Sequence, residues 1–173
     1  MTVKSIEIIQ PDDWHIHLRE KEILKAVSKY SFRINNRCIV MPNLEEPITS
    51  SKLSLKYKEE IEASFSKRLF TPLIPCYLSE NLDLKDFEYA LDKNIFFGAK
   101  LYPFNATTNS TFGVKSIEKI FPALEILTKK EKPLLIHCEK NGKEIDIFDR
   151  EKYFVDDELQ SIRKTFQDLK IVF

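Results

Sequence analysis

Glycine is scarce in this sequence, with three residues among 173. Phosphate-binding loops need several closely spaced glycines, so a Gly-rich nucleotide loop is excluded. An excess of one charge is also lacking, because 27 Lys and Arg residues balance 27 Asp and Glu residues. The resulting formal net charge of zero argues against nucleic acid or an anionic membrane as the main partner.

Cysteines are few, and long apolar runs are missing. Cys38, Cys76 and Cys138 are odd in number, lie in apolar runs and form no C-x-x-C motif, which indicates buried thiols rather than a disulfide framework. No apolar run approaches the roughly 18 residues of a membrane span, and no charged-then-apolar signal precedes the first motif. We therefore expect a cytoplasmic protein with no membrane partner.

What the sequence does contain is an alternation of short apolar runs with helical patterns. The apolar runs predict six strands, and apolar residues at helical spacing predict a helix between each pair of them. Asp83 is the expected N-cap of the third helix, and Pro122 marks a kink or a second start in the fourth. The predicted strands are 13–18, 37–41, 70–77, 96–101, 133–138 and 169–173; the predicted helices are 20–29, 53–65, 84–91, 116–130 and 149–166.

Alternating strands and helices indicate parallel β-α units. The strand starts recur about every 31 residues, and an eight-fold (β/α)8 TIM barrel takes about 250 residues. We therefore expect an α/β fold in which residues 1–173 are the N-terminal portion of one barrel domain, with about the first six strands. A doubly wound sheet fits the strand count as well. However, Arg19-Glu20-Lys21 stands where its glycine fingerprint belongs.

Two histidines, His15 and His17, stand two residues apart in the first predicted strand. Alternate side chains of a strand share a face, so His15, His17 and Arg19 project to the same side. Two such imidazoles can share a metal ion, and the Arg19 guanidinium can bind a carboxylate through two hydrogen bonds. An isolated H-x-H pattern is more often a polar pair on a half-exposed strand.

The remaining histidine, His137, ends the fifth predicted strand, and Lys100 ends the fourth. Barrel active sites gather at the carboxyl ends of the strands, which is where all three histidines fall. A histidine there is usually a packed core residue, and a lysine is usually a solvated charge. Beside two metal ions, however, a buried lysine amine can take up carbon dioxide and bridge the ions as a carbamate.

These motifs together resemble the dihydroorotases of the amidohydrolase superfamily, in their shorter bacterial, single-function class. The resemblance covers the whole chain, and its long runs are far more specific than H-x-H alone. The runs are Pro11-Asp-Asp-Trp-His-Ile-His-Leu-Arg19, Val40-Met-Pro-Asn43, Thr71-Pro-Leu73, Ala99-Lys-Leu-Tyr-Pro103, Asn105-Ala-Thr-Thr-Asn-Ser110, Leu134-Leu-Ile-His137 and Ile145-Asp-Ile-Phe-Asp-Arg150.

The resemblance implies a zinc-dependent cyclic amidohydrolase that reversibly cyclises N-carbamoyl-L-aspartate to L-dihydroorotate in pyrimidine biosynthesis, as a homodimer. It implies two zinc ions in each complete subunit. His15 and His17 would hold one ion, and His137 would help to hold the other. Lys100, as a carbamate, would bridge both.

The resemblance also implies which residues bind the substrate. Arg19 and Asn43 would bind its carboxylate, and Thr107 and Thr108 would hydrogen-bond to it from a mobile lid. By composition alone, residues 103–113 are a polar, turn-rich surface connection. A lid in this position would exclude water and complete the site.

The general-base aspartate of the family belongs to the eighth strand, beyond residue 173. A further metal-binding histidine is expected directly after the sixth strand. We therefore expect no catalytic acid or base within this chain, and no activity from it alone. Two alternatives are a hydantoinase-like hydrolase of another cyclic amide and a non-catalytic barrel-half that acts as a scaffold. The Arg19 and Asn43 pair favours a small anionic ring, and the retained metal ligands argue against a scaffold.

Overall fold

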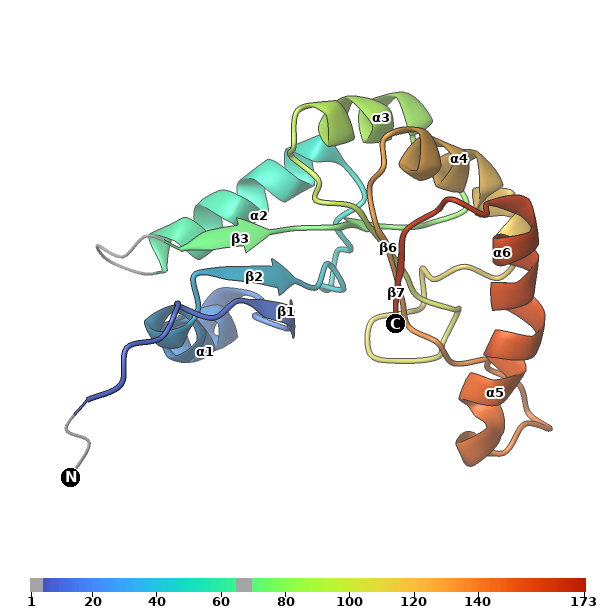
Figure 1. The fold of residues 1–173 in the computed structure, drawn as a ribbon, viewed down its shortest axis with the longest axis horizontal. Coiled ribbons are helices and arrows are strands. Elements are labelled where there is room, and N and C mark those ends of the chain that lie inside the picture. Colours follow the sequence, from blue (N-terminus) through green and yellow to red (C-terminus); the bar gives the residue numbers. More distant parts are fainter. Residues whose placement is uncertain (1–4, 65–69) are drawn as a thin grey trace.

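The computed structural model describes residues 5–64 and 70–173. Short parallel strands alternate with helices along this chain, as the sequence predicts (Figure 1). The described chain also contains the short 3-10 helices η1 (Ile117–Ile120) and η2 (Ile147–Asp149) and the short π-helix η3 (Val155–Leu159). The strands are β1 (Asp13–Ile16), β2 (Arg37–Val40), β3 (Thr71–Leu73), β4 (Cys76–Tyr77), β5 (Ala99–Leu101), β6 (Leu134–Ile136) and β7 (Ile171–Val172); the helices are α1 (Lys21–Ile34), α2 (Ser51–Ala63), α3 (Leu84–Asp92), α4 (Phe121–Lys129), α5 (Arg150–Phe154) and α6 (Gln160–Thr165).

The strands form two parallel sheets with the orders β1-β2-β3 and β4-β5-β6-β7. The prediction of one strand over 70–77 is wrong, because this segment divides into β3, which pairs with β2, and β4, which pairs with β5. Pro75 stands at the division, and a proline has no N–H to donate to a strand ladder. This segment therefore connects the last strand of the first sheet, β3, to the first strand of the second sheet, β4.

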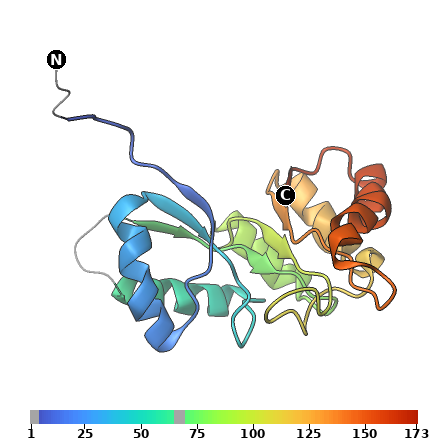
Figure 2. The same ribbon diagram turned by 90° about the horizontal axis from the view of Figure 1, so that it is seen from below.

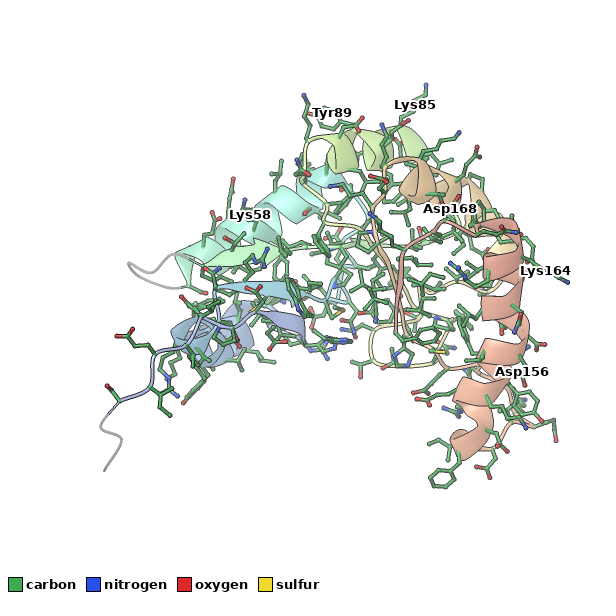
Figure 3. The ribbon with its side chains drawn as sticks, viewed as in Figure 1. Lys58, Lys85, Tyr89, Asp156, Lys164 and Asp168 are labelled. Carbon is green, nitrogen blue, oxygen red and sulfur yellow. The ribbon has the colours of Figure 1, made fainter. Side chains whose placement is uncertain are left out.

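The helices cover the outer side of a curved succession of strands (Figure 1). In Figure 3 the labelled side chains of α2, α3 and α6, such as Lys58, Lys85 and Lys164, point away from the strands. Figure 2 shows the segment before β1 running away from the rest of the molecule. Strands inside and helices outside are the arrangement of a (β/α)8 barrel, present here in part.

Several predicted helix features are confirmed. The Asp83 carboxylate caps α3 by accepting from the backbone N–H groups of Lys85 and Asp86. Pro122 lies in the first turn of α4, directly after η1, so it marks a second helix start rather than a kink. The predicted helix over 149–166 is one helical run with a π turn in its middle. Phe65, which was expected to extend α2, lies outside the described residues.

The core has two parts, which follow from the alternation of strand side chains. Cys38 and Val40 of β2 belong to the large cluster between strands and helices. Ile39 and Met41 belong to a small second cluster with Leu135 of β6. In a barrel this second face points to the interior, where side chains from neighbouring strands pack in layers.

Two further expectations concern thiols and membrane spans. Cys38 and Cys76 are buried free thiols, and Cys138 is half-buried against the large cluster, as expected for a core position. Within the described residues, no helix is both long and apolar enough to cross a membrane.

Candidate metal centre

His15 and His17 lie at the carboxyl end of β1, where the strand gives way to the loop before α1. Their ring centres are 5.3 Å apart, so the two imidazoles face the same region, as predicted. Trp14, directly before His15 in sequence, instead packs under the Arg37 guanidinium, whose central carbon lies 5.2 Å from the Trp14 ring centre. The pair therefore presents two imidazoles to the same region.

The surroundings favour the neutral form of all three histidines. Loss of hydration in the partly enclosed site lowers the pKa of His17 to about 4, and the Arg19 charge adds to the effect. The same loss of hydration is the main reason why the pKa values of His15 and His137 are lowered. Neutral imidazole is the form that binds a metal ion, so these side chains are ready to act as ligands near neutral pH.

Lys100 lies in β5, between β4 and β6, and its side chain is 2% exposed. None of the described acidic side chains lies within ion-pair distance of its amine. Burial alone lowers the pKa of Lys100 to about 8. An unpaired, buried lysine is costly and uncommon, so its retention at this position points to a chemical use.

His137 follows β6 directly, and its backbone N–H donates to the Leu101 carbonyl of β5 at 2.9 Å. Its Nε2 atom is buried without a hydrogen bond, although Glu139 Oε1 lies 3.5 Å away. The charge of Lys100 lowers the pKa values of His15, His17 and His137 alike. The fold thus gathers the four predicted metal ligands around one interior region.

These four side chains fit a metal centre only if Lys100 takes part. In the part of the chain that the structure describes, no three His, Cys, Asp or Glu side chains group closely enough to hold a metal ion. The histidine pair of β1 and His137 of β6 belong to different strands, and the lysine lies on a strand next to the latter. Three neutral nitrogen donors, one of them an unpaired buried Nε2, suit zinc, and a carbamate on the lysine would add oxygen donors.

Arg19 and Asn43, the predicted carboxylate ligands, contact each other beside the histidines. The Arg19 Nη1 donates to the Asn43 carbonyl at 3.1 Å. The Arg19 backbone has a φ of 58° in the left-handed region, and the Tyr57 hydroxyl donates to its carbonyl at 2.8 Å. A backbone held in this conformation is fixed by its surroundings, and the hydrogen bond to Asn43 holds the guanidinium beside that residue.

Residues 103–113, the predicted lid, are hydrogen-bonded to Asn43. Asn43 Nδ2 donates to the Thr108 carbonyl at 3.0 Å, and Asn109 Nδ2 donates to the Asn43 carbonyl at 3.0 Å. Thr108 is exposed, whereas Thr107 is half-buried and hydrogen-bonded through its backbone to the Ser110 hydroxyl. The structure therefore brings Thr108 beside Asn43, but turns the backbone of Thr107 towards its own loop.

Sequence reasoning missed the residues that hold this loop. Asn141 Nδ2, from the segment after β6, donates to the Phe104 and Asn105 carbonyls at 3.3 and 3.1 Å. The Glu80 carboxylate accepts from the backbone N–H groups of Lys115 and Ser116, both at 2.9 Å. These contacts join segments 35 to 37 residues apart in sequence. Local pattern carries no signal for such contacts, so they could not be found from the sequence.

No protein-family model matches the chain. Among solved structures, the fold is similar to a dihydroorotase from Campylobacter jejuni, with a TM-score of 0.86 and 36% identity over 95% of this chain and 47% of that one. It is also similar to dihydroorotase in complex with 5-fluoroorotic acid from Saccharomyces cerevisiae, with a TM-score of 0.84 and 28% identity over 93% of this chain and 46% of that one. An L-hydantoinase from Arthrobacter aurescens, at 15% identity, a TM-score of 0.72 and coverage of 94% and 40%, shares the fold alone.

The fold is therefore that of an amidohydrolase-type (β/α)8 barrel, present here in part. The sequence narrows this class further. The chain is 47% identical over 171 residues to dihydroorotases from Buchnera aphidicola and from Yersinia pseudotuberculosis, which covers 98% of this chain and 49% of each relative. It thus corresponds in sequence and in fold to part of a dihydroorotase, and it spans about half the length of the curated relatives it matches.

Proposed function

We propose that the complete protein is a dihydroorotase, which interconverts N-carbamoyl-L-aspartate and L-dihydroorotate in pyrimidine biosynthesis. Residues 1–173 form the N-terminal portion of its single barrel domain. The observation that carries this proposal is the buried amine of Lys100, which lies among three neutral histidines without an acidic partner in the described chain. We further propose that the protein works in the cytoplasm as a homodimer.

The metal ligands of this proposal are His15 and His17 for one zinc ion and His137 for a second, with Lys100 between them. The neutral Lys100 amine bonds to the carbon of carbon dioxide and releases a proton to solvent, which leaves a carbamate with two oxygen donors. Burial favours this reaction because it lowers the pKa of Lys100 to about 8 and so raises the fraction of neutral amine. Zinc bound here supplies a Lewis acid for the amide carbonyl and acidifies water.

The substrate carboxylate is assigned to Arg19 and Asn43. A guanidinium has five N–H donors in a planar fork, and Arg19 directs one of its nitrogens to the Asn43 carbonyl. Donors therefore remain for a planar carboxylate. Because Asn43 also bonds to the Thr108 carbonyl, a carboxylate at this position would contact the loop that covers it. We propose that Thr107 and Thr108 hydrogen-bond to the substrate from this loop.

No general base is assigned within the described residues, because the acidic side chains near the site already have partners. Asp12 pairs with Arg37, and Asp13 accepts from the His15 backbone N–H at 3.0 Å. Glu139 lies between His137 and Arg150, at 3.5 and 3.8 Å. We propose that the aspartate that transfers the proton belongs to a later strand of the complete barrel, so that residues 1–173 alone are inactive.

The test is hydrolysis of L-dihydroorotate by the full-length protein after reconstitution with zinc. We expect turnover at a typical enzymatic rate, loss of turnover in Lys100→Ala, and much slower hydrolysis of hydantoins. Faster hydrolysis of hydantoins would favour the hydantoinase-like alternative that the shared fold leaves open. Absence of both zinc and turnover would favour a scaffold.

A further inference from the structure

Tyr102, two residues after Lys100, has a buried hydroxyl with no hydrogen-bond partner among residues 5–64 and 70–173. Its side chain is 2% exposed. Leaving a buried hydroxyl unpaired costs roughly 1–3 kcal/mol, and a phenylalanine would fill the same space without this cost. The Tyr102 hydroxyl therefore needs a hydrogen-bond partner that the described residues do not supply.

The Tyr102 ring is fixed against the residues of the proposed metal centre. The Lys100 Nζ lies 5.4 Å from its ring centre, and the ring of His137, directly after the neighbouring strand β6, lies 6.1 Å away. The Tyr102 ring also stacks on the Tyr77 ring, with centres 5.0 Å apart and an angle of 27°. Since alternate residues of a strand share a face, Tyr102 projects to the same side as Lys100.

The stacked partner provides a contrast. The Tyr77 hydroxyl donates to the Asn109 carbonyl at 3.3 Å, so its hydrogen-bonding need is met by the loop. The Tyr102 hydroxyl and the His137 Nε2 are both buried without a hydrogen bond, and the Tyr102 ring lies close to both the Lys100 amine and the His137 ring. A hydroxyl donor and an imidazole acceptor are suited to a centre that holds both an anion and a cation.

We propose that Tyr102 is a positioning residue whose hydroxyl donates a hydrogen bond to the carbamate formed on Lys100. This inference rests on the proposed function. The carbamate carries two oxygens with lone pairs beyond those that bind metal, so it can accept this bond. A hydrogen bond to a charged acceptor contributes about 1.5–3 kcal/mol, which corresponds to roughly a tenfold to hundredfold shift in an equilibrium constant. The bond would orient the carbamate and oppose loss of carbon dioxide.

The experiment compares Tyr102→Phe with the matched control Tyr77→Phe in the full-length protein. The protein is first stripped of metal. Zinc is then added at a fixed concentration, ¹³C-labelled bicarbonate is titrated in, and the carbamate signal and the bound zinc are measured. We expect Tyr102→Phe to need at least about tenfold more bicarbonate for half-maximal uptake and to recover at high bicarbonate. Tyr77→Phe should load like the parent protein.

Unchanged bicarbonate dependence in Tyr102→Phe would overturn the inference, and an accompanying rise in KM would assign the hydroxyl to the substrate instead. Metal-free Tyr102→Phe should unfold at the same temperature as the parent or higher, because it loses an unpaired buried group. A large loss of stability would show a partner within the protein and would also overturn the inference. Failure of the proposed function is distinguishable, because the parent protein would then take up neither labelled carbon nor zinc.

Discussion

At the scale of single residues, the candidate site is defined by the removal of water from basic groups. Lys100 has no acid beside it, and its pKa falls because its charged form is poorly hydrated. The three histidines respond in the same direction. Burial thus disfavours the cationic form of each group and raises the fraction of each that is neutral.

Replacing Lys100 should therefore separate stability from function. At pH 7 the buried amine is still mostly protonated, and its pKa is about 8 instead of 10.5. Lys100→Met should raise the unfolding free energy of the metal-free protein by about 1–3 kcal/mol, because it removes this unpaired charge. Urea unfolding measures the gain. Equal or lower stability of the variant would contradict the account of the buried amine.

The histidines predict a loss of stability in acid. His17 has a pKa of about 4 in the folded chain and 6.5 in a model peptide, so below pH 6.5 the unfolded chain binds the proton first. The unfolding free energy should fall as pH falls from 6.5 towards 4. His17→Asn should flatten this part of the curve measured by urea unfolding at each pH. The same slope in parent and variant would show that His17 does not titrate in this way.

The sequence was informative at this scale, but incompletely. The spacing of His15 and His17 fixes their common face, and the strand ends place Lys100 and His137 near them. The partners of the loop could not be found in this way. Asn141 and Glu80 act through backbone groups of distant segments, and such contacts leave no pattern in the chain.

At the scale of elements, the loop over 103–113 is closed by its own backbone. Pro103 and Val114 form a β-bridge, and the Val114 N–H donates to the Tyr102 carbonyl at 2.8 Å. Asn105 and Asn109 adopt positive φ values of 55° and 54°, a conformation that asparagine tolerates better than most residues. The sequence predicted a polar loop here, but not this internal structure.

Gly113 is required at the point where the loop closes. A Cβ on Gly113 would lie 2.6 Å from the Tyr102 carbonyl oxygen and 2.9 Å from two others, all of them backbone atoms. We expect Gly113→Ala to destabilise the loop by about 1–3 kcal/mol and to speed hydrogen exchange at the Val114 amide. Gly142→Ala is the matched control, because its nearest neighbour is the end of the flexible Ile145 side chain. Similar exchange rates in both variants would count against this assignment.

The strands show where local pattern fails. The run 70–77 is apolar except for Thr71, so its composition predicts one strand. Pro75 cannot donate to a ladder, and β3 and β4 pair with different neighbours on either side of it. The order of the remaining units was still predicted correctly, because a helix separates every other pair of consecutive strands in the described chain.

At the scale of the whole molecule, the chain presents apolar surface that a closed barrel would cover. Among the described residues, β1 pairs only with β2 and β7 only with β6. Ile6, Ile8 and Ile9 are 78–95% exposed before β1, and Phe173 is 66% exposed after β7. Apolar edges of this kind favour association with other chains.

We therefore expect the polypeptide of residues 1–173 alone to bind an apolar dye such as ANS and to associate as its concentration rises. The full-length protein should do neither to the same extent, since further strands would cover these edges. Dye fluorescence and light scattering on the two proteins test this. A dye-free, monomeric 173-residue polypeptide would mean that the exposed residues are covered in another way.

The central claim is that Lys100 joins His15, His17 and His137 in one zinc centre. The most direct measurement is the zinc content of the full-length protein after dialysis, for the parent, Lys100→Met and the matched surface variant Lys85→Met. The account predicts two zinc ions per subunit in the parent and in Lys85→Met, with a large loss in Lys100→Met. Equal zinc content in all three proteins, or no zinc in the parent, would contradict it.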